Sequence, residues 1–138
     1  INAKIAAGAL VPSSITVKLL EKAMGQAYQD SGITKFLIDG FPRSHENMDA
    51  WEDTMSSNHT IKFVLDFECP EEVLVGRLLE RGQSSGRSDD NIDVIRKRFQ
   101  TFQKESMPII EHLRKNGTTV HKIASDQGVE QVYSKTVA

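Results

Sequence analysis

The chain has 138 residues, of which 38% are hydrophobic and 26% charged, and its formal net charge is −2. This composition predicts one globular domain over residues 1–138, and the weak negative charge argues against a nucleic-acid partner. Cys69 is the only cysteine, which excludes an internal disulfide and fits a reducing compartment. No apolar run approaches the ~20 residues that span a bilayer, so we expect a protein of the cytoplasm, with the nucleus as an alternative and no membrane partner.

The first segment indicates that the chain starts inside a helix. Its first residue is not methionine, and Gly8 is placed to end a helix over the first seven residues. We therefore expect further sequence upstream. Residues 9–12 should form an extended connector, and Ser13 or Ser14 should cap a helix that runs to about Gln29.

The stretch from Phe36 to Arg43 has the features of a binding loop. Phe36 to Ile38 is a short apolar run typical of a buried parallel strand, and Asp39 follows at the strand's carboxyl end, where open α/β sheets bind ligands. Gly40 permits close approach of the backbone, and the guanidinium of Arg43 suits phosphate. The same residues also fit an ordinary strand, turn and surface arginine.

Helices and short apolar strands alternate through the rest of the chain. Ser44 should cap a helix with Met48, Trp51 and Met55 on its buried face. Further strands are predicted over 61–67 and 118–123, and further helices over 70–82, over 91–116 with an interruption at Pro108, and from about residue 128. This alternation predicts an α/β fold with a parallel sheet covered by helices on both faces.

Several arginines lie around the predicted loops and on the helices beside them, namely Arg43, Arg81, Arg87 and Arg98. In an acidic chain this grouping indicates a site for several phosphate charges, as phosphoryl transfer requires. Arg77 and Arg81 are neighbours on one helix face, which also fits a solvated basic helix end favoured by the helix dipole.

The D-G-F-P-R sequence at 39–43 resembles the monophosphate-side signature of the nucleoside monophosphate kinases, the adenylate kinase superfamily. Residues from Ile5 to about Val132 look collinear with a short-lid member, and residues 77–91 and 96–99 are especially close to the UMP–CMP kinase branch. The resemblance implies transfer of the γ-phosphoryl group of ATP, with Mg²⁺, to CMP, UMP or dCMP. Adenylate kinase, which uses AMP as the acceptor, is the alternative.

The resemblance also implies roles for individual residues. Those expected to contact the acceptor nucleotide or the transferred group are Ala9, Leu10, Val11, Gly40, Phe41, Pro42, Arg43, Asn47, Arg87 and Arg98. Those expected on the ATP side are Arg77 at the base, Arg81 at the phosphates and Gln127 at the base through its main chain. Asp39 would hold the water shell of Mg²⁺, Asp89 and Asp90 would lie in a closing lid over 82–92, and residues 1–32 would form the monophosphate-binding region.

Asn47 distinguishes the branches of this family. Adenylate kinases usually carry glutamine at this offset after D-G-F-P-R, whereas UMP–CMP kinases carry asparagine. The shorter amide can pair with the edge of a pyrimidine. An ordinary polar residue in the first turn of a helix is the alternative interpretation.

No G-x-x-x-x-G-K-[ST] motif occurs in the 138 residues, so the phosphate-binding loop of the family is missing. In the family's fold the strand before that loop lies between the strands matched here by 36–38 and 61–67. We therefore expect an N-terminally incomplete form of the fold, which is either part of a whole enzyme or a short form that binds nucleotides without catalysis. The parent is expected to be a monomer, and these 138 residues alone to be inactive and either marginally stable or associated.

Overall fold

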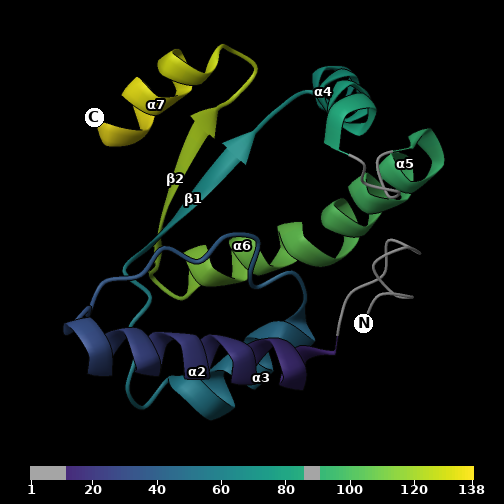
Figure 1. The fold of residues 1–138 in the computed structure, drawn as a ribbon. Helices are drawn as coiled ribbons and strands as arrows, with labels where there is room; N and C mark the ends of the chain where they lie inside the picture. The colour runs from purple at the N-terminus through teal and green to yellow at the C-terminus, as the bar shows by residue number, and fades with distance from the viewer. Residues whose placement is uncertain (1–11, 86–90) are drawn as a thin grey trace.

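The computed structural model describes residues 12–85 and 91–138 (Figure 1). Its elements, in chain order, are α2 (Ser13–Ser31), α3 (His45–Met55), β1 (Phe63–Glu68), α4 (Glu71–Ser85), α5 (Ile92–Thr101), the π-helical turn η1 (Phe102–Ser106), α6 (Met107–Lys115), β2 (Thr119–Ala124) and α7 (Val129–Val137). The predicted residues that lie outside the described ranges are Ala9, Leu10, Val11, Arg87, Asp89 and Asp90, together with the helix expected before Gly8.

The sheet consists of β1 and β2, which pair in parallel with Phe63 opposite Thr119 and Glu68 opposite Ala124. Helices α6 and α7 flank this pair, and the crossover between the strands contains α4, α5, η1 and α6 (Figure 1). A parallel pair needs such a long crossover, because the chain must return to the same end of the sheet. The predicted α/β class and the parallel sheet are confirmed.

The strand predicted at Phe36–Ile38 is wrong, because these residues form no strand. Leu37 is 86% exposed, whereas Phe36 and Ile38 pack against the core, so the segment keeps the in-and-out alternation of an extended chain. A strand also needs backbone hydrogen bonds from a neighbour. Within the described ranges the only strand pairing joins β1 to β2, so Phe36–Ile38 is an extended connector.

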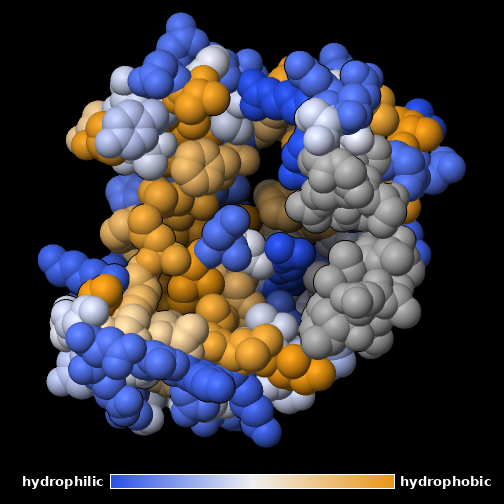
Figure 2. Space-filling model, viewed as in Figure 1, coloured by the Kyte–Doolittle hydropathy of each residue, from blue (hydrophilic) through white to orange (hydrophobic). Residues whose placement is uncertain are grey.

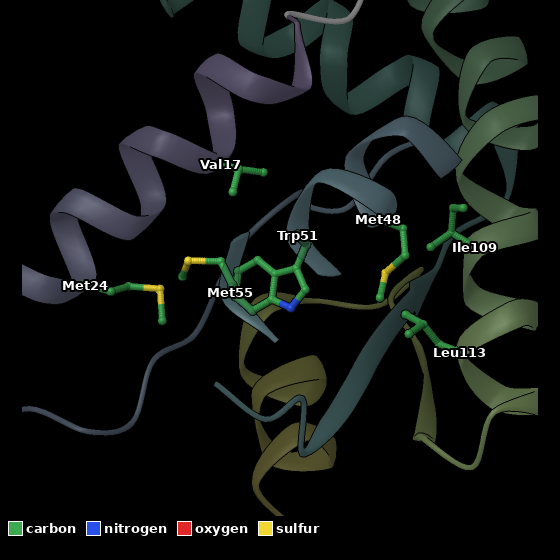
Figure 3. Close-up of a cluster of buried hydrophobic side chains, with 7 residues drawn as sticks. All are labelled: Val17, Met24, Met48, Trp51, Met55, Ile109 and Leu113. Atoms are coloured by element: carbon green, nitrogen blue, oxygen red, sulfur yellow. The ribbon is translucent and has the colours of Figure 1, made fainter. Parts of the chain in front are cut away.

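The core lies where α2, α3 and α6 meet (Figure 3). Its buried side chains are Val17 and Met24 from α2, Met48, Trp51 and Met55 from α3, and Ile109 and Leu113 from α6. The predicted apolar face of α3 is thereby confirmed. Because α3 directly follows the 39–43 turn, this core fixes the position of that turn relative to two other helices.

Three helix ends differ from the predicted ones. Pro12 stands at the N-cap of α2 without a side-chain cap, and the Ser13 hydroxyl is used in a different contact. Helix α4 continues through Gly82, since one glycine costs a helix only about 1 kcal/mol. Helix α5, predicted to begin at residue 91, begins at Ile92, because Asn91 is its cap and accepts a hydrogen bond through its side chain from a main-chain N–H of the first turn.

The interruption predicted at Pro108 is confirmed and takes the form of a wide turn. Pro108 is near the start of α6, and the five residues of η1 immediately precede this helix. Proline has no N–H to donate to the preceding turn, and a π-helical turn is one way in which a helical run accommodates that loss. The run from α5 to α6 therefore stays helical but changes its winding at η1.

Large apolar side chains remain exposed on the described part of the chain. They include Leu37, Phe63 and Phe67, and on α7 Val129 and Tyr133. Figure 2 shows hydrophobic surface around a hollow between α2, at the bottom of the view, and α7, at the top. An unpaired strand edge and contiguous apolar surface are features that another segment or chain usually covers. None of the helices in the described ranges is both long enough and apolar enough to span a membrane.

Asp66 is an unfavourable residue within β1. Its side chain is buried, and its Oδ2 atom has no hydrogen-bond partner among the described residues. Burial raises the pKa of this carboxyl group and Glu68 raises it further, while Lys122 and Arg114 act in the opposite direction. The ionised carboxylate therefore destabilises the folded state near neutral pH.

We predict that Asp66→Asn increases the free energy of unfolding at pH 7 by about 1 kcal/mol, because a neutral amide is easier to bury than a carboxylate. The folded-state pKa lies above the ordinary value of 3.8. The destabilisation is thus complete above the folded-state pKa and is relieved as the pH falls towards the unfolded-state value. Denaturant titrations followed by Trp51 fluorescence should show the difference between the two proteins narrowing from pH 7 to about pH 4. A difference that stayed constant over this range would contradict the assignment.

Candidate functional site

The turn at 39–43 is attached to the core on its apolar side. The ring of Phe41 lies 5.9 Å from that of Trp51, measured between centroids, and the Phe41–Pro42 peptide bond is cis. Ser44 caps α3 as predicted, since its Oγ accepts a hydrogen bond from the main-chain N–H of Asn47 at 3.2 Å. The polar side chains of Asp39 and Arg43 remain exposed beside this fixed turn.

Gly40 lies directly against the guanidinium of Arg43. The Nε–H of Arg43 donates a hydrogen bond to the Gly40 carbonyl at 2.5 Å. Gly40 has a φ of +65°, and a Cβ atom added to it would lie 2.5 Å from Nη2 of Arg43. The backbone conformation therefore favours glycine, and a larger residue here would also force the Arg43 guanidinium to move. The sequence predicted a close approach here, and the approaching group is the chain's own arginine.

Asn47 is buried, and both ends of its amide are in use. Its Oδ1 accepts a hydrogen bond from the Arg43 main-chain N–H at 3.0 Å, and its Nδ2 donates to Ser13 Oγ at 2.7 Å. A side-chain amide can make four hydrogen bonds, so capacity for a ligand remains. Ser13 falls within the predicted monophosphate-binding region 1–32, but its contact with Asn47 was not predicted, because 34 positions separate the two residues and no local pattern connects them.

Arg77 and Gln127, both predicted on the ATP side, are brought together by the structure. Arg77 Nη2 donates to the Gln127 carbonyl at 2.9 Å, and its Nη1 donates to the Ser125 carbonyl at 2.6 Å. Ser125 also bonds the Glu68 carbonyl through its main-chain N–H, at 2.8 Å, and through its Oγ, at 2.9 Å. The loops that follow β1 and β2 are thus joined at the carboxyl end of the sheet, with Arg77 over them.

The other predicted arginines lie on the two helices that flank residues 86–90. Arg81 is half-buried on α4, Arg98 is half-buried on α5, and each has interaction partners. Helix α5 continues into η1, where Ser106 Oγ donates a hydrogen bond to the Arg43 carbonyl at 2.9 Å. The helical run that carries Arg98 is therefore connected to Arg43. Ser106 is a further residue of this site that the sequence did not indicate.

Asp39 is exposed, and the described residues contain no group of three or more side chains arranged to hold a metal ion. A single accessible carboxylate fits Mg²⁺ that keeps most of its water molecules, which is the usual behaviour of this ion at phosphate sites. The donor set at Asp39 therefore suits an ion held through water rather than one held directly by several side chains.

Comparison with known proteins gives consistent matches. The family model described as "Adenylate kinase" matches residues 1–118. The UMP-CMP kinase of Gallus gallus is 43% identical over 131 residues, which cover 94% of this chain and 66% of the relative. The UMP-CMP kinase of Danio rerio is 43% identical over 135 residues, covering 97% and 68%, and that of Homo sapiens is 42% identical over 131 residues, covering 94% and 66%. The chain thus spans about two thirds of the length of these relatives.

We predict that Gly40→Ala displaces the Arg43 guanidinium and weakens the binding of CMP. The added methyl group would lie 2.5 Å from Nη2, so the guanidinium would have to move, and the positive φ would be strained in addition. Loss of one charge-assisted contact should reduce the affinity about tenfold or more. Calorimetric titration with CMP measures the effect.

The matched control is Gly76→Ala on α4, because a Cβ atom there meets nothing within 4 Å. Equal CMP affinities for the two variants would show that the contact between Gly40 and Arg43 has no part in binding.

Proposed function

This chain belongs to the adenylate kinase family, and we propose that it provides the acceptor side and part of the ATP side of a nucleoside monophosphate kinase. The reaction moves the γ-phosphoryl group of ATP to CMP or UMP and yields ADP with CDP or UDP. Support for a pyrimidine acceptor comes from the 42–43% identity to proteins named UMP-CMP kinase.

The observation that carries this proposal is the way in which Arg43 is held. Its side chain is exposed, while its main-chain N–H and carbonyl are bonded by the buried residues Asn47 and Ser106. A transferred phosphoryl group needs positive charge in a fixed place, because its transition state spreads negative charge over several oxygens. The main chain of Arg43 is held by two hydrogen bonds and its guanidinium is accessible, so this residue meets the need.

On the acceptor side, we propose that Arg43 and Arg98 contact the monophosphate and the transferred group, together with Arg87. Three cationic side chains from separate elements can surround a phosphate and leave one direction open for in-line attack. No side-chain base and no covalent intermediate is required, because positioning and charge account for most of the catalysis. Asp89 and Asp90 belong to the proposed lid over 82–92, whose closure would exclude water.

On the ATP side, Arg81 is proposed to contact the phosphates and Arg77 to stack on the base. The two carbonyl contacts of Arg77 orient its planar guanidinium above the Gln127 loop, and a fixed plane of this kind suits stacking. Mg²⁺, which arrives with ATP, neutralises phosphate charge when bound. Asp39 would hold its water shell, in agreement with the single exposed carboxylate there.

Acceptor choice provides one prediction. Asn47→Ala removes a bond that holds Arg43 and should therefore weaken the binding of all three nucleotides. If Asn47 also contacts the base, the loss should be about fivefold larger for CMP and UMP than for AMP, the effect of one further hydrogen bond. Binding of all three nucleotides to both proteins tests this. Ser13→Ala is the control, because it removes the internal partner of Asn47 and keeps the amide.

Two outcomes would count against this assignment. Stronger binding of AMP than of CMP by the unaltered chain would favour the adenylate kinase alternative. An equal loss for all three nucleotides in Asn47→Ala would limit Asn47 to holding the turn.

Catalysis provides a second prediction: the 138 residues should not transfer phosphate from ATP to CMP. They contain no G-x-x-x-x-G-K-[ST] segment, so no such loop and lysine hold the ATP phosphates. A chimera that adds such a segment before Ile1 should gain activity in a coupled assay of ADP release. Replacement of the added lysine by methionine is the control and should abolish the gain. Turnover by the 138 residues alone would show that the donor site is built differently.

A further inference from the structure

The inference concerns the residues that hold Arg43. Four of the buried polar residues, Ser13, Ser44, Asn47 and Ser106, belong to one hydrogen-bonded network around the Arg43 peptide. Asn47 accepts from the Arg43 N–H, and Ser106 donates to the Arg43 carbonyl. Both main-chain groups of an exposed arginine are thus bonded by buried neutral side chains.

Within this network, the bond from Ser106 is the one that joins distant parts of the chain to Arg43. Asn47 and Arg43 are four positions apart, so their bond belongs to the turn itself. Ser106 and Arg43 are 63 positions apart, and Ser106 is the last residue of η1, which directly follows the helix α5 that carries Arg98. The Ser106 hydroxyl therefore connects the two arginines that are proposed to contact the acceptor phosphate.

The direction of this hydroxyl is unusual for a helical residue. Serine and threonine in helices commonly donate to the carbonyl four positions earlier. Thr101 donates in this way to the Lys97 carbonyl, and Ser134 to the Glu130 carbonyl. Ser106 instead donates outside its helix to Arg43, from the last position of the wide η1 turn. The changed winding before Pro108 thus coincides with a hydroxyl that is bonded to the 39–43 turn.

We propose that Ser106 is a positioning residue of the acceptor site, whose hydroxyl fixes the Arg43 peptide to the helical run that carries Arg98. The two arginines are thereby held as one unit towards the monophosphate. This inference rests on the proposed function, because it assigns to Arg43 a phosphate ligand. It adds to that function a residue that does not itself touch the substrate.

A matched pair of variants separates the hydroxyl from the shape of the side chain. Ser106→Thr keeps the hydroxyl, and Ser106→Val has nearly the same shape without it, so any crowding in this buried position affects both alike. Thr101→Ala is the control, because it removes a hydroxyl from the same helical run that bonds only within the helix.

Two measurements on each variant test the proposal. The ¹³C chemical shift of the Arg43 carbonyl, followed by NMR without ligand, should differ between Ser106→Val and Ser106→Thr, because the hydroxyl that donates to this carbonyl is kept only in the threonine variant. The affinity for CMP should fall about tenfold between the same two variants, while the affinity for cytidine, which has no phosphate, should stay the same. Thr101→Ala should change neither quantity.

Equal chemical shifts of the Arg43 carbonyl in the valine and threonine variants would overturn the proposal. So would equal losses of CMP and cytidine affinity, since these would indicate a general structural effect. If the unaltered chain did not bind CMP, the proposed function would fail and the acceptor role of Ser106 with it. The carbonyl chemical shifts would still decide separately whether the Ser106 hydroxyl bonds the Arg43 carbonyl.

Discussion

The packing of α3 between two other helices is the constraint on which the acceptor side depends. Trp51 and the methionines on either side of it are buried against α2 and α6, and each large apolar side chain contributes about 1.5–3 kcal/mol. Phe41 packs against Trp51, and Asn47 lies on the same helix, next to Met48. The turn that contains Arg43 therefore cannot shift unless α3 also leaves its place in the core. Exposed arginines contribute little to stability, so the apolar contacts supply the rigidity that the charged groups need.

The small sheet and the exposed apolar surface have a common physical origin. Among the described residues, β1 pairs only with β2, and Phe36–Ile38 is extended without a strand partner. Parallel strands are normally buried on both faces and paired along both edges, since free backbone groups need partners. The side chains of Leu37, Phe63 and Phe67 are also exposed, so the faces of these segments are not fully covered by the described residues. Helices satisfy their backbone hydrogen bonds locally, whereas parallel strands depend on distant partners, and among the described residues this second requirement is met only between β1 and β2.

The features that the sequence predicted correctly depend on local patterns. The apolar spacing of α3, the cap at Ser44 and the interruption at Pro108 each follow from residues within a few positions of one another. The strand at Phe36–Ile38 was predicted wrongly because strand formation depends on a neighbour far away in the sequence. Ser106 and the contact of Ser13 with Asn47 were missed for the same reason, since the partners of Ser13 and Ser106 lie 34 and 63 positions away. Arg77 and Gln127 also lie far apart, and only the family resemblance placed them together.

The site divides its polar residues into two kinds with different tasks. Neutral buried groups, the amide of Asn47 and the hydroxyl of Ser106, bond the main chain of Arg43, and burying them costs much less than burying ions. Among the described residues no carboxylate pairs with the Arg43 side chain, so its charge remains for an anion. Lys122 and Glu68 behave differently, because they form an exposed ion pair in which each charge already has a partner. An arginine held by its peptide rather than by a salt bridge keeps both a fixed position and an uncompensated charge, and phosphate binding requires the two together.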